Sequence, residues 1–220
     1  MSTQVQKRDL NELRRLIVEY LLAELKAQGI HRPVSLRKVQ KLLALALFAR
    51  YRDGKFVLEV SSLAKLFDFR VSRYGPFSKV VSDILTKYFL VKRESDEAGV
   101  SLVMTTRSRE EVLHDLESTA EKLGLTREVR DLVERITDAV KRRGMFRADT
   151  IGSEVDRVLG LTRELKILLF DVDILDLLAV RDKALSSEAE VELRTFFGDL
   201  CDKLKDPELV RKMRDSLRGE

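Results

Sequence analysis

The chain has one cysteine, no tryptophan and no long apolar run, and each shortage excludes a class of protein. Cys201 alone cannot form an intramolecular disulfide or a cysteine metal site, so we interpret it as a small core residue. The longest apolar runs, at 42–49 and 166–170, are far too short to span a bilayer. The first ten residues lack the apolar segment of a secretory signal. These features predict a cytoplasmic protein without a membrane segment.

Residues that would indicate catalysis are also scarce. The sequence has no phosphate-binding glycine loop, no dinucleotide fingerprint, no nucleophile elbow and no HExxH motif. Its two histidines, His31 and His114, are far apart, and we interpret both as structural. Asp173 and Asp176 could share a helix face, but without a histidine nearby a solvated polar stripe is the favoured interpretation. The sequence therefore predicts no enzyme activity, no metal site and no cofactor.

Amide side chains are rare, with one asparagine and four glutamines against 35% charged residues, a balance typical of proteins from hot environments. The net charge of +4 conceals an asymmetry between the two halves. Residues 1–110 carry 21 basic and 12 acidic side chains, whereas residues 111–220 carry 20 and 25. The basic half is suited to a polyanion. The alternative is that these charges are simply scattered over two solvated domains.

Helical periodicity dominates the rest of the sequence. Apolar residues recur every three or four positions, and cap residues mark several ends. Ser108 and Glu111 form a predicted capping box, and Gly124 and Gly160 are predicted helix stops. The helices predicted in this way cover 7–28, 35–51, 108–123, 126–143, 150–159, 163–185, 187–200 and 207–219.

Between these helices, residues 70–106 have a different pattern. Tyr-Gly-Pro at 74–76 is a turn signal, and Pro76 is suited to the first turn of a helix that extends to Phe89. Two short apolar segments on either side of a charged, glycine-containing loop then predict a β-hairpin. A strand at 55–60 and a short helix at 63–67 precede the turn.

The order helix, strand, helix, turn, helix, strand, strand predicts a winged helix-turn-helix with a small β-hairpin wing. The predicted fold class is therefore mainly α, with two domains. Residues 1–106 form the winged-helix domain with an N-terminal buttressing helix. Residues 107–220 form an all-α domain for dimerisation or partner binding, because strand signals end and the charge changes sign near residue 106.

A winged helix suggests a non-catalytic DNA-binding protein, such as a transcriptional regulator that binds double-stranded DNA as a homodimer. Lysine and arginine attract phosphates, and serine can contact phosphates or base edges. The alternative is a protein-interaction module, such as an antitoxin or assembly subunit, whose winged helix binds a partner protein. The predicted DNA contacts are Arg70, Arg73, Ser78, Lys79, Ser82, Lys87, Lys92, Arg93 and Arg107.

Residues 39–106 resemble two known groups. In small winged-helix regulators of the PadR type, the hairpin ends in a threonine that leads into a helical dimerisation domain, as at 105–106 here. Lys-Leu-Leu at 41–43 and Tyr-Gly-Pro-Phe-Ser at 74–78 resemble the Panacea domain of toxin–antitoxin systems. The chain has no tryptophan to match the one usual before Tyr-Gly-Pro in that family. The first resemblance implies a dimeric transcription regulator, and the second implies an antitoxin.

Overall fold

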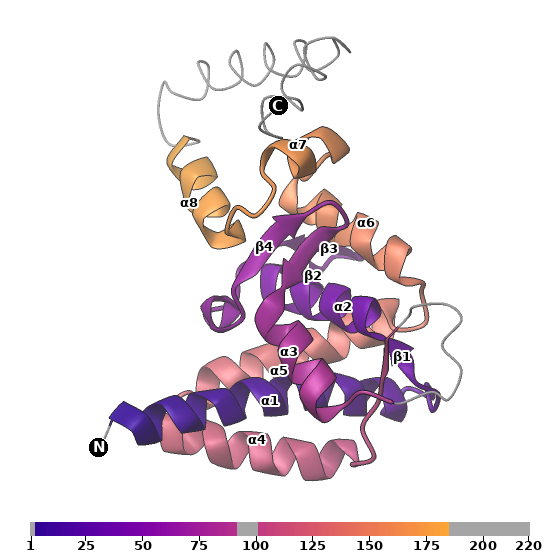
Figure 1. The fold of residues 1–220 in the computed structure, drawn as a ribbon, viewed down its shortest axis with the longest axis vertical. Coiled ribbons are helices and arrows are strands. Elements are labelled where there is room, and N and C mark those ends of the chain that lie inside the picture. The colour runs from indigo at the N-terminus through magenta and orange to yellow at the C-terminus, as the bar shows by residue number, and fades with distance from the viewer. Residues whose placement is uncertain (1–2, 92–100, 185–220) are drawn as a thin grey trace, which may run out of the picture.

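A computed structural model describes residues 3–91 and 101–184, which form a mainly helical protein with small antiparallel sheets (Figure 1). The predicted helices beyond residue 185, Cys201 and the wing loop lie outside the described residues. In chain order the elements are α1 (Thr3–Ala27), β1 (Val34–Ser35), α2 (Leu36–Phe48), β2 (Ala49–Arg52), β3 (Lys55–Leu58), the 3-10 helix η1 (Ala64–Leu66), β4 (Phe69–Ser72), β5 (Gly75–Ser78), α3 (Lys79–Tyr88), β6 (Leu102–Val103), α4 (Arg109–Leu123), α5 (Thr126–Arg143), α6 (Ala148–Leu159), α7 (Arg163–Leu168) and α8 (Ile174–Ala184).

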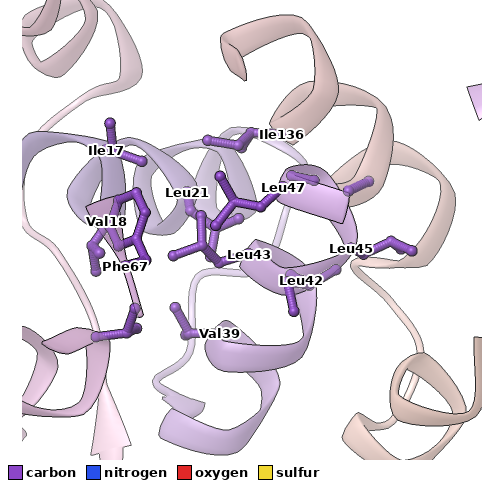
Figure 2. Packing of buried hydrophobic residues seen from close by; sticks show 14 of the residues in the cluster. Ile17, Val18, Leu21, Val39, Leu42, Leu43, Leu45, Leu47, Phe67 and Ile136 are labelled. Carbon is purple, nitrogen blue, oxygen red and sulfur yellow. The ribbon is translucent and has the colours of Figure 1, made fainter. Parts of the chain in front are cut away.

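Helix α2 lies at the centre, and its second half is buried on every side (Figure 1). Leu43 and Leu47 of α2 pack with Leu21 of α1, Phe67 and Ile136 of α5 in one cluster (Figure 2). Helices α4 and α5 pack against α1, while α5 and α6 pack against α2. The apolar stripes of α4, α5 and α6 are therefore covered by helices that precede residue 106. One hydrophobic core crosses the domain boundary that the sequence predicts.

Residues 89–91 and β6, which follow α3 in the chain, form a small three-stranded arrangement with β1. β1 pairs with β6, with Val34 opposite Val103. On the other edge of β6, Leu90 forms an antiparallel bridge with Val103. The Val91 N–H donates to Leu102 O at 2.9 Å, and the Met104 N–H donates to Phe89 O at 3.1 Å. Residues 89–91 and β6 are thus paired antiparallel after α3, as the sequence pattern predicts, and β1 adds a third strand.

Two further hairpins, β2–β3 and β4–β5, stand between α2 and α3. The prediction that Pro76 begins a helix is wrong, because Pro76 lies in β5 opposite Val71 and α3 begins at Lys79. The predicted short helix at 63–67 is a single 3-10 turn. Beyond Phe48 the predicted second helix is instead strand β2.

The predicted helix over 163–185 is divided into α7 and α8. Helix α7 ends at Leu168, and Asp171 in the loop that follows adopts a left-handed backbone conformation with φ +64°. The backbone there pairs with β4, since the Asp171 N–H donates to Val71 O and the Val71 N–H donates to Val172 O, both at 2.9 Å. The Asp173 carboxylate then accepts from the Leu175 N–H at 2.7 Å and caps α8. Asp173 therefore has a structural task.

Several of the predicted helix ends are confirmed. The Ser108–Glu111 capping box is present, and Gly124 and Gly160 end α4 and α6 in the left-handed conformation. Ser35 caps α2. None of the described helices is long and apolar enough to cross a membrane.

Candidate nucleic-acid interface

Helix α3 is fixed at its start by α2. The Gln40 side-chain amide donates to Ser78 O at 2.8 Å, and the Ser78 N–H donates to Gln40 Oε1 at 3.0 Å. Ser78 Oγ also accepts from the Val81 N–H at 3.1 Å and caps the helix. Val81 and Leu85 are buried against the core. The first turn of α3 therefore has a defined position, with its opposite face directed to solvent.

The outward face of α3 is polar. Lys79, Asp83, Thr86 and Lys87 are exposed, and Ser82 is half-buried. Lys79 Nζ lies 3.2 Å from the Asp83 carboxylate, an exposed pair one helical turn apart. Such a pair is worth little in water, so Lys79 can exchange this carboxylate for another anion at small cost. The face offers two cations and two hydroxyl groups with one acidic residue among them.

Two of the predicted contact residues have internal tasks instead. Ser78 is wholly buried, and its hydroxyl donates to Phe67 O while it caps α3, so its side chain is not exposed for the predicted contact with DNA. Arg107 is half-buried and forms ion pairs with Glu19 at 3.4 Å and Asp115 at 2.6 Å. Its position holds the start of α4 against α1. The sequence pattern placed it at the end of the wing and gave no sign of these partners.

The remaining predicted DNA contacts differ in their exposure and in their ion pairs. Arg73 is exposed in the turn between β4 and β5. Arg70 is exposed but pairs with Asp68 at 3.3 Å and Asp171 at 3.7 Å. Lys92 and Arg93 lie outside the described residues.

Lys41 also holds β5, a role that the sequence pattern does not indicate. Lys41 is only 3% exposed, and its Nζ donates to Pro76 O at 2.9 Å. The side chain passes over Gly152 of α6, where it lies 3.7 Å from the position that a Cβ would take. The Lys-Leu-Leu motif at 41–43 is thus in contact with the Tyr-Gly-Pro motif at 74–76, through Lys41 and Pro76. Side chains of α2 thus donate hydrogen bonds to the backbone carbonyl groups of Pro76 and Ser78 in β5.

Burial lowers the pKa of Lys41 to about 8, against an ordinary value of 10.5. The negative charge of Asp156 opposes this shift, and the positive charges of Lys166 and Arg37 add to it. Lys166 Nζ binds Asp156 Oδ2 at 2.6 Å, whereas Asp156 Oδ1 is buried and has no hydrogen-bond partner among the described residues. A buried, protonated lysine destabilises the fold at neutral pH relative to alkaline pH.

We expect Lys41→Met to remove a pH dependence that the wild type has. Between pH 8 and 10.5 the unfolded chain binds the Lys41 proton more tightly than the folded chain, so wild-type stability rises with pH. Urea unfolding from pH 7 to pH 10 should show wild type gaining up to about 3 kcal/mol over the variant. A constant difference between the two proteins over this range would contradict the assignment.

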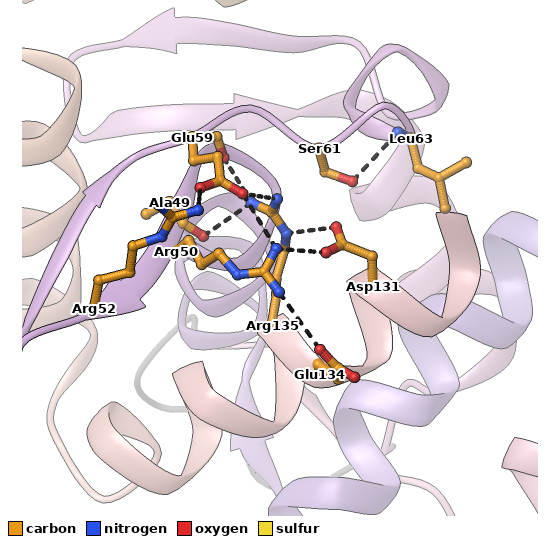
Figure 3. Close-up of polar contacts among 9 residues, drawn as sticks. All are labelled: Ala49, Arg50, Arg52, Glu59, Ser61, Leu63, Asp131, Glu134 and Arg135. Carbon is orange, nitrogen blue, oxygen red and sulfur yellow. Dashed lines mark hydrogen bonds and ion pairs between the residues drawn. The ribbon is translucent and has the colours of Figure 1, made fainter. Parts of the chain in front are cut away.

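Some of the basic charge of residues 1–110 is paired with carboxylates of the acidic half (Figure 3). Arg50 pairs with Asp131 at 2.7 Å, Glu59 at 3.2 Å and Glu134 at 3.5 Å. Arg135, 6% exposed, joins the same cluster. These pairs bind the basic half of the chain to the acidic half. The charge asymmetry therefore serves the fold as well as any partner.

Among the described residues, no group of three histidine, cysteine, aspartate or glutamate side chains is placed to hold a metal ion. Comparison of the chain with models of protein families, with curated proteins and with solved structures gives no match. The function is therefore inferred from the geometry alone.

Proposed function

We propose that the chain is a winged-helix protein that binds double-stranded DNA through α3. The carrying observation is the small sheet, in which β1 and residues 89–91 both pair with β6 immediately after α3. When residues 49–78 are set aside, the order α1, β1, α2, α3, residues 89–91 and β6 matches that expected of a winged helix. On this assignment the two helices of the helix-turn-helix are α2 and α3, and residues 49–78 are an insertion between them. The sequence pattern had instead paired residues 63–67 with α3.

The chemistry of α3 supports this assignment. A recognition helix turns one face to the core and presents the other to the major groove. Lys79 and Lys87 can contact phosphates, while Ser82 and Thr86 can contact phosphates or base edges. Asp83 repels phosphate, and it also reduces binding to DNA of the wrong sequence. We propose a regulatory role, exercised without catalysis or cofactor by a homodimer that presents two copies of α3.

The test is the affinity for a fluorescently labelled DNA duplex, measured by anisotropy at low salt. The variant Lys79→Glu/Lys87→Glu should lose about tenfold or more in affinity, because it adds two negative charges where phosphates lie. Lys122→Glu/Arg127→Glu is the matched control, since these exposed basic residues lie at the α4–α5 junction. Equal affinities for the two variants would contradict a role for α3.

A protein-interaction role is the second candidate, and one observation favours it. Large apolar side chains are exposed near α7 and α8, including Ile167, Phe170 and Val180, each more than 60% exposed. Exposed apolar side chains of this size are common at protein interfaces. Binding of a partner protein, with unchanged affinity in Lys79→Glu/Lys87→Glu and no DNA binding in wild type, would favour this function.

A further inference from the structure

The turn between β4 and β5 presents an exposed aromatic ring beside a group of cations. Tyr74 is 67% exposed, and the Arg37 guanidinium carbon of α2 lies 5.0 Å from its ring centroid. Arg73 precedes Tyr74 in the turn, and Lys38 follows Arg37 in α2. Arg32, in the loop before β1, is close enough to lower the pKa of Lys38 together with partial burial, the larger cause. We call these four cations and Tyr74 the turn cluster.

The positive charge of the turn cluster is not neutralised by the part of the protein that the structure describes. None of its four cations forms an ion pair with a described residue, whereas Arg50, Arg70 and Arg107 each pair with carboxylates. Like charges held close together repel one another, and an external anion would relieve that repulsion. Among the described residues, the turn cluster is therefore a group of cations without paired carboxylates.

The turn is held rigidly. Ser72 Oγ donates to Gly75 O at 2.6 Å and accepts from the Tyr74 N–H at 3.3 Å. Lys41 Nζ donates a hydrogen bond to the backbone oxygen of Pro76, two residues beyond Tyr74. A ligand that binds here does not have to order the backbone first, so little entropy is lost.

The turn cluster also flanks α3. Strand β5 leads from Tyr74 directly into α3, and Gln40 ties that junction to α2. On the other side, the first residue of α2, Leu36, donates its N–H to Ser101 O at 3.1 Å, in the segment that follows the wing loop. Arg37 and Lys38 therefore lie between the start of α3 and the end of the wing loop.

We infer that the turn cluster is a second DNA-contacting surface, which binds the phosphate backbone beside the groove that α3 enters. This inference rests on the proposed function. Arginine, lysine and the tyrosine hydroxyl all donate hydrogen bonds to phosphate oxygens. Such contacts carry no sequence information, so the turn cluster sets the affinity and orientation of the protein on DNA rather than its choice of sequence. The inserted β4–β5 hairpin thus extends the surface of the winged helix.

The experiment compares the salt dependence of duplex binding in full-length variants. Each phosphate contact contributes about 0.9 to the slope of log affinity against log salt. Arg37→Gln/Arg73→Gln should lower the slope by about 2 and weaken binding to different duplexes by the same factor. Lys55→Gln/Lys65→Gln is the control, because both residues are exposed cations of the same half outside the turn cluster. Circular dichroism melts should show both variants folded as wild type.

The outcomes separate this inference from the proposed function. A wild-type slope in Arg37→Gln/Arg73→Gln, with DNA binding otherwise intact, would overturn the second surface and leave the role of α3 standing. A loss of binding that differs between duplex sequences would also overturn it, because phosphate contacts are blind to sequence. No duplex binding by wild type at low salt would overturn both proposals.

Discussion

Replacement of Arg135 by methionine should lower the free energy of unfolding by about 3 to 5 kcal/mol, because it breaks a buried charge cluster. The Arg135 guanidinium donates to Asp131 at 2.7 Å, to the Glu59 carboxylate at 2.6 Å and to the Glu59 backbone oxygen at 2.7 Å (Figure 3). It thereby joins α5 to the segment that follows β3. Methionine fills a similar volume, but it leaves the Glu59 backbone oxygen without this donor and removes the buried cation that pairs with Glu59 and Asp131. Urea denaturation measures the effect.

Arg52→Met is the matched control for Arg135→Met. Arg52 binds the same Glu59 carboxylate, but its side chain is exposed. An exposed pair contributes at most about 1 kcal/mol, so this variant should remain close to wild type in stability. A loss in Arg135→Met no larger than that in Arg52→Met would mean that the buried cluster does not stabilise the fold.

Gly75→Ala is expected to be the second most damaging single change, at about 2 to 4 kcal/mol. Gly75 has φ +87°, a conformation that alanine adopts with strain. A Cβ there would lie 2.6 Å from Asp156 Oδ1 and 3.1 Å from Lys41 Nζ. Asp156 is held by Lys166, so it cannot withdraw freely. Thermal unfolding should show a fall of about 4 to 12 °C.

Gly54→Ala separates the backbone strain of a positive φ from the close contact of the added Cβ. Gly54 has a similar φ of +82°, but no atom lies within 4 Å of its added Cβ. Its loss should be limited to the backbone strain of about 1 to 2 kcal/mol. The excess loss in Gly75→Ala then measures the close contact with Asp156. Equal losses in the two variants would show that this contact has no energetic effect.

Features that depend on a few consecutive residues were predictable. Helix periodicity, the Ser108–Glu111 capping box and the glycine stops at Gly124 and Gly160 all follow from local chemistry. The antiparallel segments after α3 also follow from an alternation of apolar and turn residues. Local patterns gave less guidance between α2 and α3, where Pro76 was assigned to a helix rather than to a strand.

What could not be predicted depends on contacts between distant residues. Gln40 and Lys41 look like polar positions on a helix, yet they bind backbone groups 38 and 35 residues away. The carboxylate partners of Arg107 are Glu19, which is 88 residues away, and Asp115, which is 8 residues away. No sequence pattern connects these residues, so Arg107 is interpreted from the sequence as a DNA contact. The apolar stripes after residue 106 predict a helical region for dimerisation or partner binding, and the sequence does not show that those of α4 and α5 pack against α1. Lys79, Ser82 and Lys87 remain predicted contacts on the outward face of α3.

The central claim, that this chain binds duplex DNA through a cationic surface, is tested most directly by titrating wild-type protein into a labelled duplex over a series of salt concentrations. Lys79 and Lys87 on α3, together with Arg37, Lys38 and Arg73 of the turn cluster, would give a slope of about 4.5 in magnitude for log affinity against log salt. An absence of binding at low salt, or an affinity that does not change with salt, would contradict the claim.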